Sequence, residues 1–442
     1  MTSVNAARGR PSASRVSAAG LAFALSLLAA GLTGCKPATT ADGGKPPPGT
    51  LVKATYETLL ADNKAAIASG ESLVKGPLTD TATPLTVVGL YNERARLTGD
   101  YNDYGRAEDL LTRLETQFGK TDSLCLARAK MHFTLHRLAA AKAVLDGCPR
   151  LAAKGDDLGL RADIAFYSGR YKDAGIIYRA LVNQVGNSQA YIQLALYDAK
   201  TGAPGEASAM MEAAEQRYHG ASPLQESWFA LQRGLIQLDR GLYDEARSMY
   251  ALADERLPGY WLNREHMAEA TRLKGDTAAA RKIYEDVVLK TGAPEYLDAL
   301  GVIEADTGDA KGAKTLLDRA EVIYDDRAKR FPEAIAGHAL AHYLTAAPQP
   351  AKALALAEAN FKNRPYGDAA IALAKAQLLN GRPKEAQRLL EQQLAQGWDT
   401  AETWWILSMA ADAAGDSARA KTAAAEATRR NVHSAAQYAF KF

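Results

Sequence analysis

The sequence has little of what enzymes usually carry. Its 442 residues include seven histidines and three cysteines, and no Gly-x-Ser-x-Gly or Cys-x-x-Cys motif occurs. The stretch from Gly308 to Thr315 contains glycines and lysines but lacks the spacing of a phosphate-binding loop. These absences predict a protein that is not an enzyme and that holds no cofactor.

Histidines form two pairs spaced one helical turn apart, His132 with His136 and His338 with His342. This spacing suits a metal site on a helix. Neither pair has the glutamate of the zinc-protease helix, and no third ligand is evident. We therefore expect solvated histidines and no metal.

The chain also lacks an excess of charge of either sign. It contains 53 lysine and arginine residues against 51 aspartate and glutamate residues, a formal net charge of +2. Nucleic-acid-binding proteins usually have a concentrated basic surface. The composition therefore predicts that nucleic acids are not partners.

Long apolar runs are absent except near the start of the chain. Residues 18–30 are apolar and follow three arginines within the first 15 residues. A run of this length is too short for a permanent membrane-spanning helix, but it fits a secretory signal peptide. Residues 1–34 are therefore expected to be a leader.

The leader ends in Leu32-Thr33-Gly34-Cys35, which resembles a bacterial lipobox. The resemblance implies cleavage before Cys35 and attachment of acyl chains, which would anchor the protein stably. With Lys36 next, it also implies the outer membrane, facing the periplasm. An ordinary signal peptide with a chance cysteine is the alternative. Residues 35–50 are rich in proline and glycine and are expected to form an extended tether.

Small residues recur along the rest of the chain with a fixed period. Ten alanines follow one another at steps of 33, 34, 39 or 40 residues, and another small residue stands twelve positions before each. A period near 34 is typical of stacked helical hairpins. The alanines are Ala107, Ala141, Ala174, Ala207, Ala246, Ala280, Ala313, Ala353, Ala386 and Ala420; the earlier residues are Ala95, Ala129, Ala162, Ala195, Gly234, Ala268, Gly301, Ala341, Ala374 and Ser408.

The units resemble tetratricopeptide repeats. In the fifth, residues 225–239 and 243–255 predict two helices separated by Arg240-Gly241. In this family an aromatic residue stands four positions after the alanine of the second helix. Tyr178, Tyr250 and Tyr284 occupy that position here. The resemblance implies an all-α, right-handed superhelical solenoid of about ten hairpins. We expect the array over residues 85–428, capping segments over 51–84 and 429–442, and a longer unit before each long step. The second long step holds a charged stretch, residues 324–332, which predicts an extended helix.

The resemblance also implies a binding groove along the inner face of the first helices. In the middle of the array this groove would be apolar and flanked by acids, which suits an extended or helical peptide. Its residues are Ile192, Leu196, Trp228, Leu231, Leu235, Leu238, Glu265, Glu269 and Trp405. The alternative is that these side chains contact a neighbouring helix, or that the assignment is shifted by one residue.

Two further cysteines fall in the second unit. Cys125 lies early in its first expected helix and Cys148 late in its second, so antiparallel packing brings both to one end of the hairpin. A disulfide is expected in an oxidising periplasm. Two buried free thiols are the alternative.

These observations predict a non-enzymatic, lipid-anchored scaffold that binds other envelope proteins, which are not identified by the residues. Export, pilus or secretin assembly, and cell-wall machinery are the processes in which similar lipoproteins serve. The alternative is a receptor for a glycan, for peptidoglycan or for a small solute, which would stack on Trp228 and Trp405.

Overall fold

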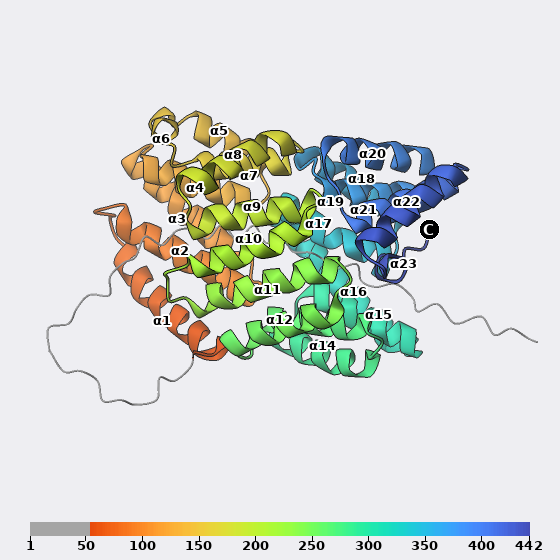
Figure 1. Cartoon of the computed structure of the whole chain (residues 1–442). Helices are drawn as coiled ribbons and strands as arrows, with labels where there is room; N and C mark the ends of the chain where they lie inside the picture. Colours follow the sequence, from red (N-terminus) through yellow and green to blue (C-terminus); the bar gives the residue numbers. More distant parts are fainter. Residues whose placement is uncertain (1–53) are drawn as a thin grey trace, which may run out of the picture.

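The computed structural model describes residues 54–442. The expected leader (1–34), the lipidation site Cys35 and the tether (35–50) lie outside the described residues. Within them the protein has 23 α-helices and one short π-helix, and no strand beyond an isolated bridge between Thr201 and Asp399. The predicted all-α array of tetratricopeptide-like hairpins is confirmed (Figure 1).

The chain forms ten helical hairpins, which we number 1 to 10, together with three additional helices. The hairpins are α2 (Ala82–Thr98) with α3 (Asn102–Phe118), α4 (Asp122–Thr134) with α5 (Leu138–Asp146), α7 (Leu158–Tyr167) with α8 (Tyr171–Gln184), α9 (Ser188–Lys200) with α10 (Pro204–Gln216), α11 (Pro223–Asp239) with α12 (Tyr243–Arg256), α13 (Trp261–Leu273) with α14 (Thr277–Thr291), α15 (Pro294–Thr307) with α16 (Ala310–Arg330), α17 (Pro332–Ala341) and the π-helix η1 (His342–Ala346) with α18 (Pro350–Asn363), α19 (Gly367–Leu379) with α20 (Pro383–Gln396), and α21 (Ala401–Ala413) with α22 (Ser417–Arg430). The additional helices are α1 (Tyr56–Val74), α6 (Pro149–Lys154) and α23 (Ser434–Gln437).

The turn inside a typical hairpin is set by a glycine and a capping residue. In hairpin 6, Gly275 takes a φ of 96°, a left-handed conformation that costs glycine little. The next residue, Asp276, accepts a hydrogen bond from the backbone N–H of Ala279 at 3.0 Å and so caps α14. The chain therefore reverses over three residues, and the two helices of the hairpin pack side by side.

The recurring small residues lie where helices approach most closely. Nine of the ten second-helix alanines are buried; Ala420 is half-buried, because its hairpin is the last of the array. In hairpin 5 a Cβ on Gly234 would overlap the ring of Tyr250. Larger side chains at these positions would force the helices apart.

The two long steps have different causes. In hairpin 4 the extra residues lie in the connection from α10 to α11 and in the early start of α11 at Pro223. In hairpin 7 they lengthen α16, which runs for 21 residues as the charged stretch before Phe331 predicts. The longer α16 carries the chain across to hairpin 1.

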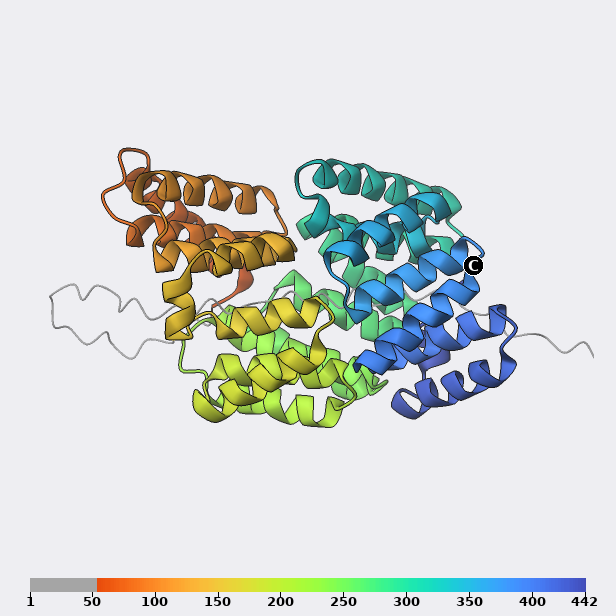
Figure 2. The same cartoon turned by 90° about the horizontal axis from the view of Figure 1, so that it is seen from above.

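Successive turns of the superhelix pack directly against one another. Arg327, in the last turn of α16, donates to the carbonyl oxygen of Gly99 at 3.4 Å, and the rings of Phe331 and Tyr101 lie 5.8 Å apart. Hairpin 1 also contacts the start of hairpin 6, where the Trp261 indole donates to the carbonyl oxygen of Leu97 at 2.6 Å. Figure 2 shows the two halves of the chain lying side by side.

Trp398 lies at the centre of the contact between hairpins 3, 9 and 10. It is fully buried, and its ring centroid lies 5.6 Å from that of Phe166, 5.4 Å from that of Tyr171 and 5.8 Å from that of Tyr366. The backbones also meet here, since a Cβ on Gly169 (φ 74°) would lie 2.6 Å from the carbonyl oxygen of Pro365.

Both ends of the described chain are fastened to its middle. The N–H of Tyr56, at the start of α1, donates to the carbonyl oxygen of Pro258 at 3.0 Å. At the other end, Tyr243 donates to the side-chain oxygen of Gln437 at 3.0 Å, and Asn431 donates to the carbonyl oxygen of Asp239 at 3.1 Å. The superhelix is thus wound tightly enough to close around its own axis.

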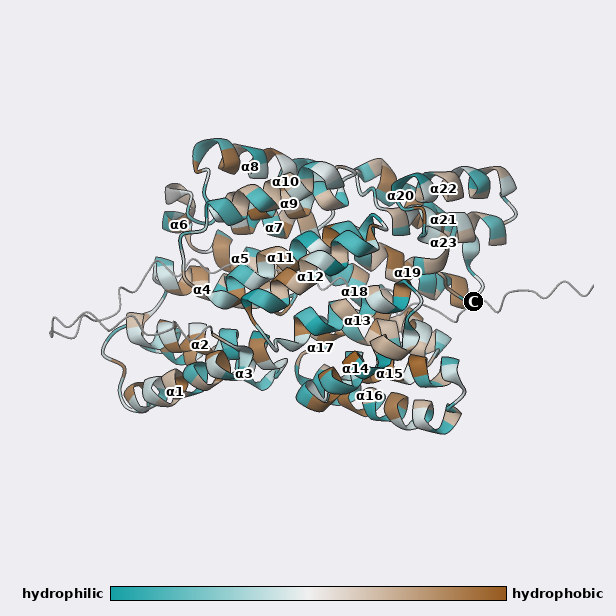
Figure 3. Cartoon of the chain, turned by 60° about the horizontal axis from the view of Figure 1, so that its bottom comes forward, coloured by the Kyte–Doolittle hydropathy of each residue, from teal (hydrophilic) through white to brown (hydrophobic). Residues whose placement is uncertain are grey.

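Polar and apolar residues alternate around the helices (Figure 3). Each helix packs its apolar stripe against its neighbours and leaves polar residues at the surface. Over residues 54–442, no helix has both the length and the apolar composition that a bilayer crossing requires.

Candidate ligand-binding cavity

A cavity of about 460 Å³ lies at the centre of the superhelix. Eight of the ten hairpins contribute to its wall, all except hairpins 3 and 7, and the segment after α22 closes one side. Because the contributing helices are far apart in sequence, the cavity exists only when the superhelix is closed.

The wall of the cavity has an apolar part and a charged part. Leucine, isoleucine and alanine side chains come from α11, α17, η1 and α19, and the charged groups come from the ends of several helices. The apolar residues that we use below are Leu235, Leu238, Leu340, Leu344, Ile371 and Ala372. The wall therefore offers an apolar surface together with many polar and charged groups.

Most of the charged groups in the wall are paired. Lys200 lies 3.3 Å from Asp239 and 3.9 Å from Asp368, and Lys375 lies 2.6 Å from Glu402. Burial lowers the pKa of Lys200, but the surrounding carboxylates outweigh this and raise it above its ordinary value. Burial raises the pKa of Asp368, and the charge of Lys200 opposes that shift. The two lysines face three acids, so this group carries one more negative than positive charge when all five side chains are ionised.

Arg364 is the exception among the buried charges of the wall. It is 5% exposed, and its side chain makes one hydrogen bond, from Nη2 to Oδ1 of Asn360 at 3.3 Å. The guanidinium lies over the ring of Tyr366, 5.2 Å from its centroid. Its Nε is buried without a hydrogen-bond partner, and no carboxylate of residues 54–442 forms an ion pair with it. A buried and unpaired charge of this kind is costly to the fold.

His136 lies in the same wall and has a strained backbone. Its φ is 62°, and it is the one residue other than glycine with a positive φ in the described chain. Glycine fills the corresponding turn position in most other hairpins, including Gly169, Gly241 and Gly275. Burial, reinforced by the charge of Arg364, lowers the pKa of His136 well below its ordinary value, so the imidazole is neutral. Its Nδ1 has no hydrogen-bond partner.

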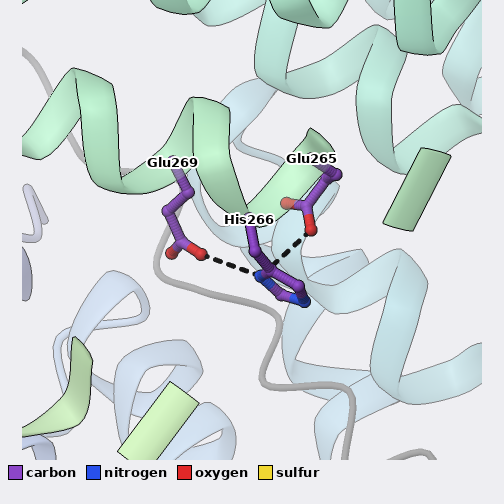
Figure 4. A group of neighbouring side chains, drawn as sticks. All are labelled: Glu265, His266 and Glu269. Atoms are coloured by element: carbon purple, nitrogen blue, oxygen red, sulfur yellow. Dashed lines mark hydrogen bonds and ion pairs between the residues drawn. The ribbon is translucent and has the colours of Figure 1, made fainter. Parts of the chain in front are cut away.

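A histidine and two glutamates from α13 lie beside the cavity (Figure 4). The Nδ1 of His266 lies 3.1 Å from a carboxylate oxygen of Glu265 and 3.3 Å from one of Glu269. Burial raises the pKa of Glu265 to about 7. Burial lowers the pKa of His266, but the two carboxylates outweigh it and raise the value. The residue types suit a divalent cation, but the bonds to Nδ1 account for the arrangement without one.

The expectation of solvated histidines is wrong: Nδ1 is buried in both His132 and His136, and the second pair is buried as a whole. His338 and His342 are buried, and each lies against an acid of α15, His338 at 3.1 Å from Glu295 and His342 at 2.7 Å from Asp298. Burial favours a higher pKa for Glu295, but His338 and Arg327 lower the pKa below its ordinary value. The repeat period could not reveal these pairs, because they join neighbouring first helices at positions that face inward.

The structure divides the residues that we expected in an open groove. Ile192, Trp228 and Leu231 are buried against other helices, at 2%, 4% and 2% exposure, and present no surface to a partner. Leu196 packs partly buried beside Ile192, and Trp405 packs partly buried in the C-terminal part of the core. Glu265 contacts His266. Leu235, Leu238 and Glu269 line the central cavity. The difference arises because the next turn of the superhelix covers the inner face.

Cys125 and Cys148 are joined by a disulfide, with their Cα atoms 6.5 Å apart. Cys125 lies in the first turn of α4, and Cys148 follows α5 and precedes α6. The bond therefore ties the open end of hairpin 2, where α5 is only 9 residues long.

Three solved structures are similar to this chain at low identity. A tetratricopeptide repeat protein from Parabacteroides merdae is 16% identical, over 55% of this chain and 93% of its own, with a TM-score of 0.33. The human IFIT1 dimer with m7Gppp-AAAA is 13% identical, over 84% and 94%, with a TM-score of 0.38. The APC/C hetero-tetramer Cut9–Hcn1 is 13% identical, over 87% and 82%, with a TM-score of 0.37. These scores support no argument about ligands. No family model and no curated protein sequence matches the chain.

Proposed function

We propose that the protein is a non-enzymatic binding protein that holds its ligand in the cavity at the centre of the superhelix. The cavity itself carries the proposal: it encloses about 460 Å³ between hairpins from both halves of the chain. A volume in this range surrounds most of a small organic molecule. Such a receptor is the alternative function that the sequence indicates. The ligand would now lie inside the superhelix and not against Trp228 and Trp405.

The wall of the cavity favours binding over catalysis. No serine or cysteine is among its described residues, and two of its three threonine hydroxyls are engaged locally. Thr345 donates to the carbonyl oxygen of Ala341 at 2.6 Å, and Thr400 shares a hydrogen bond with Thr403 at 2.8 Å. Neither of these two hydroxyls is therefore held by a general base.

Filling the cavity is expected to abolish binding of a neutral apolar probe, N-phenyl-1-naphthylamine. The wild-type protein should bind one molecule per chain with a rise in fluorescence, and Ala372→Trp in the wall should reduce binding at least tenfold because the indole occupies the space. Ala278→Trp, on the exposed face of α14, is the matched control and should bind as wild type does. Equal binding by wild type and Ala372→Trp would show that the probe binds elsewhere.

We also propose that the protein is lipid-anchored through Cys35 at the outer membrane and faces the periplasm. The lipobox-like residues before Cys35 support this location. The disulfide between Cys125 and Cys148 supports it as well, since such bonds persist in oxidising compartments. Cys35→Ala should move the protein from the membrane to the soluble fraction; retention in the outer membrane would refute the anchor.

A scaffold for other envelope proteins is the second candidate, and the repeat architecture favours it, since stacked hairpins present long faces for protein contacts. On the described surface, however, the most exposed apolar residues lie on different elements: Ile176 on α8, Leu289 on α14, Val322 on α16 and Val432 in the segment after α22. Single exposed residues are normal for a soluble protein. The cavity is therefore the better supported site.

A further inference from the structure

We propose that Arg364 binds the carboxylate of a small organic acid whose apolar part lies along the inner wall of the cavity. The proposal rests on the proposed function and adds the chemical class of the ligand. It starts from a guanidinium that is 5% exposed, lines the cavity and forms no ion pair with an acid of the described residues.

The surroundings hold the guanidinium in place without neutralising it. Asn360 accepts its one side-chain hydrogen bond, and the ring of Tyr366 lies under it. On the other side, a Cβ on Gly337 would lie 3.2 Å from Nη2, so α17 approaches closely. Asn360 and Tyr366 carry no charge, and Nε remains without a partner. The fold therefore places a fixed donor group in the cavity and leaves the charge for a ligand.

The ion pairs in the wall single out Arg364 as the buried cation available to a ligand. Lys200 and Lys375 form ion pairs with acids, whereas Arg364 forms none and interacts with the charge of Asp368 at longer range. A carboxylate carries one charge, and its two oxygens match the parallel N–H groups of a guanidinium. A phosphate dianion would bring a second negative charge that no unpaired buried cation of the described wall offsets.

The rest of the site fits a ligand with an apolar body. Leu340 and Leu344 from hairpin 8 and Ile371 from hairpin 9 line the same cavity. His136 adds a neutral imidazole with a free Nδ1, held by a strained backbone. The positive φ belongs to the hairpin turn, where most other hairpins have glycine, and the turn places the imidazole in the same wall.

The test compares three probes that differ in their end group: hexanoate, hexanamide and hexylamine. Titration calorimetry should show that hexanoate binds at least tenfold more tightly than the amide or the amine. Arg364→Gln should weaken hexanoate binding at least tenfold and leave N-phenyl-1-naphthylamine binding unchanged. Arg364→Lys should recover part of the affinity, because it keeps the positive charge but not the parallel N–H groups of the guanidinium.

Arg388→Gln is the matched control. Arg388 is exposed on α20 and lies outside the wall of the cavity. Hexanoate binding by this variant should stay within twofold of wild type. If Arg364→Gln also loses the neutral probe, the cavity has collapsed in that variant. The hexanoate affinity of Arg364→Lys, compared with that of wild type, then tests the role of the guanidinium.

Two further probes identify the source of the carboxylate. A hexapeptide with a free C-terminus that binds more tightly than hexanoate, and than its own C-terminal amide, would mark a protein terminus as the acid. Binding of hexanoate without the peptide would mark a free small acid. Equal binding of hexanoate and hexanamide, competition by inorganic phosphate at the same concentration, or failure of every acid to bind overturns the proposal. If the neutral probe still binds in any of these cases, the proposal that the cavity binds a ligand stands, and only the carboxylate assignment fails.

Discussion

Trp398→Ala is expected to lower the free energy of unfolding by about 3–5 kcal/mol and to open the superhelix. The side chain is fully buried, and its removal would leave a large void between Phe166, Tyr171 and Tyr366. These residues belong to different turns of the superhelix, so the void lies at the contact that closes it. Urea denaturation measures the loss, and small-angle scattering should show a larger radius of gyration.

The control for this variant is Trp405→Ala. Trp405 lies in the same region, on α21, but it is partly exposed. Its ring packs against no other aromatic ring of the described chain. Its loss should cost about 1 kcal/mol and leave the scattering curve unchanged. Unchanged dimensions for Trp398→Ala would mean that other contacts suffice to close the superhelix.

Replacing both cysteines of hairpin 2 with alanine is expected to cost about 3 kcal/mol. The disulfide joins residues 23 apart in sequence, and without it the unfolded chain gains conformational freedom. The disulfide ties α4 to the junction of α5 and α6, which are among the shortest helices of the array, with 9 and 6 residues. Few other contacts are therefore available to hold this end of the hairpin.

Denaturation with and without dithiothreitol measures this contribution. The reductant should destabilise the wild-type protein by the same amount as the Cys125→Ala/Cys148→Ala double variant, and it should have no effect on the variant itself. Proteolysis should begin near residues 146–158 when the bond is absent. Equal stability of the oxidised and reduced proteins would contradict the expected role.

The period of the small residues was enough to predict each hairpin. Ala246 and Ala280, with their partners Gly234 and Ala268, set the phase of hairpins 5 and 6, and the helices lie where the phase puts them. Local signals succeeded because a hairpin and its next neighbour are determined by residues close in sequence. The charged stretch that lengthens α16 is a further example.

The contacts between turns could not be predicted in the same way. A repeat period describes the packing of one hairpin on the next, and it contains no signal for which distant hairpins meet. Ile192 and Trp228 therefore occupy inner positions as the family resemblance implies, yet other helices cover them. Arg364 follows no period and lies outside the helices, so the sequence offered no reason to single it out. His136 could have been noticed, because it stands where most hairpins have glycine.

The fastening of both ends of the described chain to hairpins 5 and 6 changes how the array can come apart. Solenoids commonly fray from their terminal repeats, since each unit is stabilised by its neighbours alone. Here the hydrogen bond from Tyr56 to Pro258 and the contacts of Gln437 with Tyr243 secure the two ends against the middle. Loosening either end exposes the central hairpins as well, so loss of the first or last helix propagates inward. The molecule behaves as a ring closed by non-covalent contacts, with no loose repeat from which unfolding can start.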